Sequence, residues 1–142
     1  PEIVDLRFEG DAFTPAEDSR GRRTLVVGAP PEGVLAHLPP GVHLYEENRE
    51  SPVLGIDGWE QTVTLRLEID EEDLYSVPAD FQLETLLGRF EVRSWHQDGW
   101  LTVVRHLSLG AGMVPADQWP ALRALLLEEN DPEHGPIILK DE

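Results

Sequence analysis

FEVRSWHQDGWLTVVRHLSL, residues 90–109, is the stretch that decides the fold of this 142-residue chain. On both sides of Asp98-Gly99, apolar side chains alternate with polar ones, as at Leu101, Val103 and Leu107. A repeat of two residues places one face of a strand in the core and the other in water. Asp-Gly between two such segments is typical of a tight hairpin turn in which both central residues have positive φ. The sequence therefore predicts a hairpin of strands 90–97 and 100–109.

Further strands are predicted on both sides of this hairpin. Residues 62–69 alternate most regularly, with Val63, Leu65 and Leu67 on the core face. Residues 42–45 could form a strand, and residues 81–87 fit either a strand or a helical turn. Shorter strands are expected at residues 3–8, 24–27, 74–78 and 137–139. Pro78 confines residues 74–78 to a sheet edge, and the final strand is expected at an edge as well.

Glycine and proline predict where these strands stop. Residues 10–23 are polar and are expected to form a loop, and Asp57-Gly58 is a strong turn signal. Gly110-Ala111-Gly112 is expected to end the second strand of the hairpin.

One helix is predicted near the C-terminus. Asp117 fits its N-cap or first turn, and Pro120 fits a first turn whose amides have no helical partner. Asn130, Asp131 and Pro132 are expected to end it. One helical stripe holds the residues expected to face the core, namely Trp119, Leu122, Leu125, Leu126 and Glu129.

These elements favour a mainly β (α+β) fold, an antiparallel β-sandwich or rolled sheet with one C-terminal helix and a short closing strand. The length fits a single β-rich domain spanning residues 1–142, because there is no internal repeat and no linker. Since the chain starts at Pro1 without a methionine or a signal segment, we expect it to be a piece of a longer protein.

Charge and composition exclude several kinds of partner. The formal net charge of −17 repels phosphate backbones and anionic membrane surfaces, so nucleic acid is not expected as a partner. Solubility explains such a charge most simply, although a surface for divalent cations or basic partners, or a high-salt habitat, would also fit. No apolar run is long enough to insert into a membrane. The absence of cysteine excludes disulfides, a thiolate nucleophile and Cys-ligated zinc, but leaves the compartment open.

Histidines and carboxylates supply two weak candidate metal sites. His96 and His106 flank the hairpin turn and could lie opposite each other as zinc ligands, but a third ligand is missing. The run Asp70 to Asp73 offers carboxylates to calcium, but it lacks the glycine and the spacing of an EF-hand loop. Hydrogen-bonded strand histidines and a solvated acidic turn are the favoured interpretations, so no metal site is predicted.

Catalytic patterns are equally weak. No serine lies in a Gly-x-Ser-x-Gly elbow, and no glycine loop could cradle a phosphate. With 28 acidic residues, a carboxylate pair of the glycosidase type carries no information. The tryptophans could stack on sugars but are explained better by core and hairpin packing; they are Trp59, Trp95, Trp100 and Trp119. We therefore expect no catalytic residue, no cofactor and no enzymatic activity.

Residues 77–140 resemble the C-terminal β-domain of bacterial transglutaminase-like proteins, which have a papain-like core. The resemblance rests on a Val-Pro before the sheet, the hairpin rhythm, a Val-Pro-x-x-x-aromatic-x-x-Leu-Arg helix start and a closing apolar strand. In this chain these are Val77-Pro78, Asp98 to Leu109, Val114-Pro115 to Trp119 with Leu122-Arg123, and Ile137 to Leu139. Residues before 70 match more loosely, around Leu38-Pro39-Pro40-Gly41.

The resemblance implies a non-catalytic accessory or interaction domain associated with a transglutaminase- or protease-like core, in a periplasmic or secreted bacterial protein. The catalytic Cys, His and Asp of that family belong to the core, and none can be carried over to a chain without cysteine. The partner would be the neighbouring catalytic domain or another protein. The alternative is a ligand-binding β-module for calcium, carbohydrate or an extended peptide.

Overall fold

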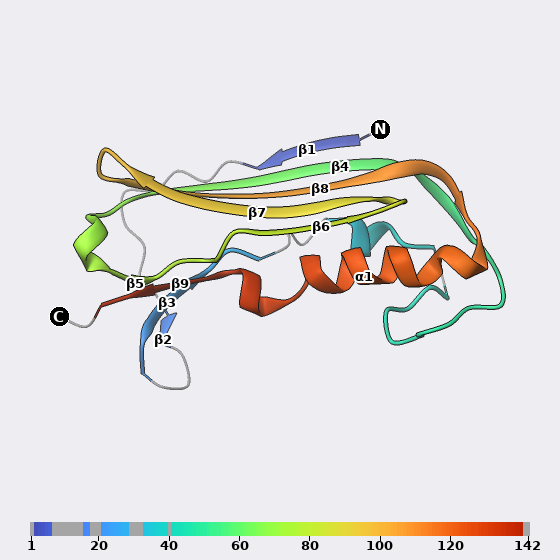
Figure 1. The fold of residues 1–142 in the computed structure, drawn as a ribbon, viewed down its shortest axis with the longest axis horizontal. Coiled ribbons are helices and arrows are strands. Elements are labelled where there is room, and N and C mark those ends of the chain that lie inside the picture. The colour runs from blue at the N-terminus through green and yellow to red at the C-terminus, as the bar shows by residue number, and fades with distance from the viewer. Residues whose placement is uncertain (1, 7–15, 18–20, 29–32, 40, 141–142) are drawn as a thin grey trace.

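The computed structural model describes residues 2–6, 16–17, 21–28, 33–39 and 41–140, and the fold is mainly β (Figure 1). A five-stranded sheet has the order β1-β4-β8-β7-β6, and a four-stranded sheet has the order β2-β3-β9-β5. The strands of the larger sheet are β1 (Glu2–Leu6), β4 (Val53–Glu68), β8 (Trp100–Val114), β7 (Gly88–Gln97) and β6 (Phe81–Thr85). Those of the smaller sheet are β2 (Ala16–Glu17), β3 (Arg23–Val26), β9 (Pro136–Leu139) and β5 (Leu74–Ser76).

The hairpin of β7 and β8 is confirmed as the centre of the larger sheet. Its last pair is Gln97 with Trp100, and the two turn residues both have positive φ, 53° at Asp98 and 81° at Gly99. This is the conformation expected of a two-residue primed turn, whose twist matches that of the flanking strands.

β4 includes residues 62–68 of the strand predicted at 62–69 but begins nine residues earlier, at Val53. The predicted turn at Asp57-Gly58 is therefore wrong, and so is the predicted end of the second hairpin strand at residues 110–112. The two segments pair with each other instead: Asp57 lies opposite Ala111, and Ile56 lies opposite Gly112. Gly58 and Gly112 have positive φ, 75° and 117°, so glycine here permits irregular backbone inside strands rather than ending them.

The other strands are compared with the sequence predictions by their position in each sheet and by whether they form. β9 lies between β3 and β5 rather than at an edge, whereas β5 is an edge strand as predicted. β1 runs parallel to β4, the only parallel pair among the described strands. Residues 81–87 contain strand β6, while residues 42–45 form turns and no strand. Most of the predicted loop at residues 10–23 lies outside the described residues.

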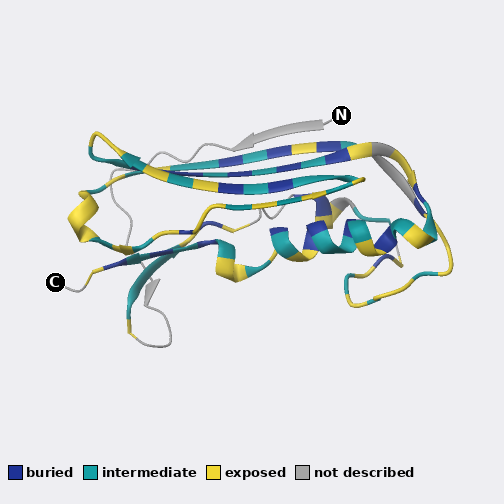
Figure 2. Ribbon diagram, viewed as in Figure 1, coloured by how far each residue is buried: buried dark blue, intermediate teal, exposed yellow. Residues whose placement is uncertain are grey.

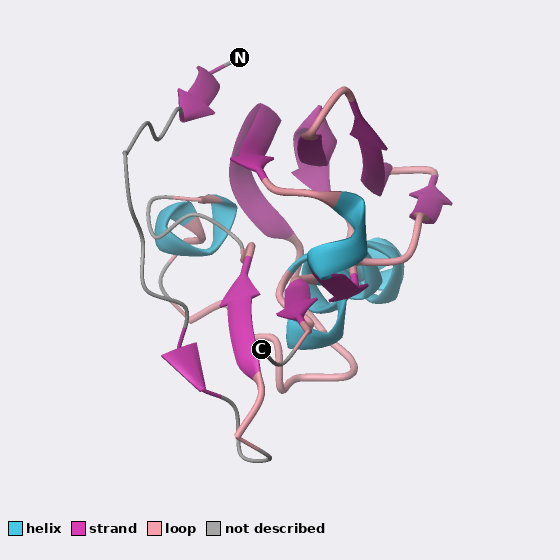
Figure 3. Ribbon diagram, turned by 90° about the vertical axis from the view of Figure 1, so that its left-hand side faces the viewer, coloured by secondary structure: helices cyan, strands magenta, loops and turns pink. Residues whose placement is uncertain are grey.

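The core lies on one side of the larger sheet. The α-helix α1 (Trp119–Glu129) and the smaller sheet both lie against that side, as the two views show (Figures 1 and 3). Burial alternates along β7 and β8 and follows one stripe of α1 (Figure 2). All five predicted stripe residues of α1 are buried. None of the described helices has the length and apolar character needed to cross a membrane.

The glycine at the start of β7 packs so closely against the backbone of β8 that no side chain fits there. A Cβ at Gly88, where φ is 157°, would lie 2.0 Å from the carbonyl oxygen of Ser108 and 3.0 Å from Cα of Leu109. Because both are backbone atoms, no side-chain rotation relieves the contact. We expect Gly88→Ala to lower the free energy of unfolding by about 1–3 kcal/mol in urea denaturation, as overpacking does. Gly28→Ala is the control, since a Cβ there meets no atom of the described residues within 4 Å; equal losses for both variants would contradict this account.

Candidate functional site

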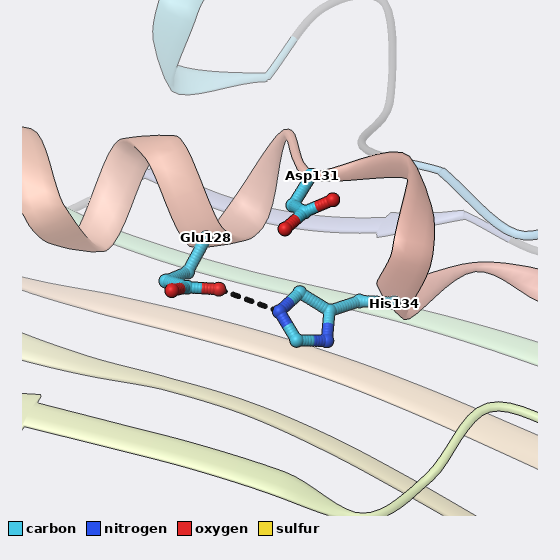
Figure 4. Close-up of side chains that lie close together, drawn as sticks. All are labelled: Glu128, Asp131 and His134. Carbon is cyan, nitrogen blue, oxygen red and sulfur yellow. Dashed lines mark hydrogen bonds and ion pairs between the residues drawn. The ribbon is translucent and has the colours of Figure 1, made fainter.

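Three potential ligand side chains meet just beyond the C-terminal end of α1 (Figure 4). They are Glu128 in the last turn of the helix, Asp131 just after it, and His134 at the end of the short 3-10 helix η4 (Pro132–His134). One ligand atom from each side chain lies within 4.8 Å of the others, and all three residues are half-buried. Nε2 of His134 lies 2.6 Å from a carboxylate oxygen of Glu128.

The chain reversal after α1 follows from local chemistry. Asn130 ends the helix with its side-chain amide donating to the carbonyl of Leu126 at 2.8 Å. The Asp131 carboxylate then accepts the Glu133 N–H at 2.9 Å and so caps η4, in which Pro132 occupies the first turn. This reversal brings His134 back over Glu128.

The imidazole of His134 is held in place by aromatic packing. Its centroid lies 4.2 Å from that of Phe81 and 6.1 Å from that of Phe90. The ring orientation is therefore set by core side chains of β6 and β7, and Nε2 is directed at Glu128. An imidazole nitrogen and two carboxylates form either a hydrogen-bonded ion pair or a metal donor set.

The sequence patterns did not predict this cluster, because Glu128 and His134 are six residues apart and lie in two different helices. Helical spacing would require three or four residues. The only local signal is the Asp-Pro that follows the helix and turns the chain back.

His96 and His106, considered above as a weak candidate for a zinc pair, do not lie opposite each other. His96 is paired with Leu101 and His106 with Glu91, so the two histidines stand five positions apart along the hairpin and point to opposite faces. Nε2 of His96 lies 2.6 Å from the carbonyl oxygen of Ile69, and Nε2 of His106 lies 3.5 Å from a carboxylate oxygen of Glu60.

The acidic run at residues 70–73 is a solvent-exposed turn. Residues Glu71–Asp73 form the 3-10 helix η2, and the Asp70 side chain does not cap it. Within the described residues, these carboxylates do not converge on a common point that could hold an ion. The observed geometry favours the solvated-turn interpretation.

Two of the four tryptophans lie in the core, and the other two lie on the side of the larger sheet that points away from α1. Trp59 and Trp119 are buried, while Trp95 is 46% exposed. Trp100 is half-buried, with the Arg66 guanidinium 4.7 Å from its ring centroid. The prediction that Trp119 faces the core is confirmed.

A buried polar network crosses the core and was not predicted. The Trp59 indole N–H donates to the Gln61 side-chain oxygen at 3.1 Å, and the Gln61 amide donates to the Glu129 carboxylate at 2.6 Å. The Arg105 guanidinium donates to the backbone carbonyls of Val27 and Glu129. It therefore ties β8 to the segment after β3 and to the end of α1.

The two charges in this network are only partly compensated. Burial raises the pKa of the Glu129 carboxyl, and the Gln61 hydrogen bond and the Arg105 charge oppose that rise. Burial likewise lowers the pKa of Arg105, against the effect of Glu129. The second carboxylate oxygen of Glu129 is buried and has no hydrogen-bond partner among the described residues. A buried carboxyl with a raised pKa is typical of functional sites, but here its neighbours are core side chains.

Comparison with known proteins gives one solved relative of the fold. No protein-family model matches the sequence, and no curated protein matches it. The crystal structure of a "putative protease" from Parabacteroides distasonis is similar, with a TM-score of 0.70 and 15% sequence identity. The match covers 87% of this chain and 24% of that protein, so this chain spans about a quarter of its length. At this identity, the likeness shows the fold alone.

Proposed function

We propose that this chain is a non-catalytic accessory domain that packs beside the catalytic core of a larger protein, of the protease or transglutaminase class. The observation that carries this proposal is that the matching fold makes up only a small share of a longer protein. In the Parabacteroides distasonis protein the same fold accounts for only 24% of the chain. There the fold is one part of a much longer polypeptide, and we extend that arrangement to this protein.

The surroundings of the histidines support a non-catalytic role. The sequence has no cysteine, so any acyl-transfer nucleophile would have to be a hydroxyl group with a base beside it. The four histidines with described side chains contact other groups: His43 stacks on Tyr45, His96 faces a backbone carbonyl, and His106 and His134 face glutamates. None of these contacts involves a serine or threonine hydroxyl.

The outer face of the larger sheet is the surface we propose for the contact with the core domain. We define this outer face as the side of β4, β8, β7 and β6 that points away from α1. It carries the exposed residues Trp95 and Arg93, together with Trp100 beneath Arg66. Tryptophan and arginine are the side chains that most often dominate the energy of protein interfaces.

Binding between separately produced parts tests this proposal. We expect the isolated domain to show no peptide hydrolysis and no amine transfer, and to bind the remainder of its full-length protein in calorimetry. Replacing both Trp95 and Arg93 with alanine should weaken that binding by about tenfold or more. Leu86→Ala is the matched control, because Leu86 is 74% exposed and lies between β6 and β7, outside the outer face. Turnover by the isolated domain, or equal affinity of all variants, would refute the proposal.

A ligand-binding module is the second candidate, favoured by the exposure of Trp95 and by the free edge of β6. An exposed indole can stack on a sugar ring, and an edge strand can pair with an extended peptide. Calorimetric titration with a glycan panel, calcium and extended peptides separates the two candidates, since only a ligand-binding module should give saturable heat.

A further inference from the structure

We propose that Glu128, Asp131 and His134 bind one divalent transition-metal ion, with zinc as the reference ion. The three side chains come from a segment of seven residues that spans the end of α1 and η4. Their ligand atoms already lie within 4.8 Å of one another, which places three donors around a common point. All three residues are half-buried and keep part of their surface exposed, so an ion can reach them from solvent.

Small side-chain movements are enough to admit the ion. Zinc lies about 2.0–2.2 Å from imidazole nitrogen and carboxylate oxygen, so tetrahedral ligand atoms stand about 3.4 Å apart. Nε2 of His134 and the Glu128 carboxylate are closer than this, at 2.6 Å, and must separate slightly. The Glu128 side chain is 36% exposed and can rotate outward, while the backbone stays as it is.

The other two ligands, His134 and Asp131, are already oriented by contacts with neighbouring groups. The His134 ring packs against Phe81, with 4.2 Å between centroids, so its nitrogen is directed before any ion arrives. One carboxylate oxygen of Asp131 accepts the Glu133 N–H at 2.9 Å, which fixes the carboxylate at the start of η4. Such outer contacts set the orientation of metal ligands and contribute to affinity.

The donor set selects the class of ion. One imidazole and two carboxylates carry a charge of about −2 when the histidine is neutral, which a divalent ion neutralises. Imidazole favours zinc and its first-row neighbours over calcium and magnesium, which prefer oxygen ligands only. Three protein ligands leave a fourth position for water. Binding requires that Nε2 of His134 carry no hydrogen, because the nitrogen must offer its lone pair to the ion.

The test uses tag-free protein and conservative variants. Glu128→Gln can still bond His134, and Asp131→Asn can still cap η4, so both variants should fold. We expect wild-type protein to bind one zinc ion in calorimetry, to gain thermal stability with zinc, and to give visible absorption bands with cobalt. Each variant should bind zinc about tenfold more weakly or worse. His106→Gln is the matched control, since it removes the exposed His106–Glu60 pair, which no third ligand joins in the described part of the chain.

The outcomes separate a site from weak surface binding. Retained affinity in Glu128→Gln and Asp131→Asn would place the ion elsewhere and overturn the proposal, as would an absence of saturable binding to wild type. Displacement of zinc by equimolar calcium would show that the imidazole is not a ligand, and would also overturn it. Loss of binding in His106→Gln alone would assign the ion to the outer face of the larger sheet.

Discussion

Arg105→Met is expected to lower the free energy of unfolding by about 3–5 kcal/mol near neutral pH, the usual effect of removing one partner from a buried charged network. The guanidinium of Arg105 donates to the carbonyls of Val27 and Glu129, and methionine can donate to neither. It would also leave the Glu129 carboxylate buried without a nearby positive charge. Urea denaturation measures the loss. Arg93→Met is the control, because Arg93 is 59% exposed and surface ion pairs contribute about 0–1 kcal/mol.

The loss caused by Arg105→Met should depend on pH. Burial already raises the pKa of Glu129 above its unfolded value, and removing the Arg105 charge raises it further. A raised acid pKa costs no stability below the unfolded pKa, where the carboxyl is protonated in both states, and costs progressively more as pH rises toward the folded pKa. The variant should therefore lose more stability at pH 7.5 than at pH 4.5. Combining it with Glu129→Leu should recover much of the loss. An equal loss at both pH values would contradict this role for Glu129.

Trp119→Ala is expected to lower the free energy of unfolding by about 3–5 kcal/mol, as large-to-small changes in a core do. Trp119 is fully buried, and its indole N–H donates to the Glu46 carbonyl at 2.6 Å. The Arg49 guanidinium lies 5.5 Å from the ring centroid. The ring therefore holds the irregular segment at residues 41–52 against the start of α1, and hydrogen exchange of these amides should become faster in the variant.

Two control variants separate the parts of this effect. Trp119→Phe keeps an aromatic ring but removes the N–H, so it should cost less than alanine while still speeding exchange near Glu46. Trp95→Ala removes a tryptophan that is 46% exposed and should change stability far less. A similar loss at both tryptophans would show that burial of Trp119 is not the cause.

The parts of the fold that the sequence predicts are those fixed by local periodicity. The hairpin around Asp98-Gly99 and the buried stripe from Trp119 to Glu129 follow from repeats of two and 3.6 residues, which need no knowledge of distant partners. The start of β4 could not be predicted in this way. Glycines at residues 58, 110 and 112 normally signal turns, and it is the pairing of β4 with β8, through Ile56 with Gly112 and Asp57 with Ala111, that keeps these segments extended.

The site residues were missed for a related reason. Arg105 lies on the same core-facing side of β8 as Leu101, Val103 and Leu107. The alternation of the sequence does not reveal that two backbone carbonyls accept hydrogen bonds from its guanidinium. The Glu128–His134 contact depends on a chain reversal and on Phe81, which lies about fifty residues earlier in the sequence. Both arrangements are products of tertiary packing.

The central place of β9 has a consequence for the order of folding. β9 separates β3 from β5, and its partner residue for Thr24 is Ile138. Pairing over such a sequence distance closes a very long loop, which slows folding. During synthesis, the hairpin of β7 and β8 can form while the chain is still growing. The four strands of the smaller sheet cannot all pair until residues 136–139 leave the ribosome, so until then β5 lacks its partner in that sheet and β3 can pair only with β2.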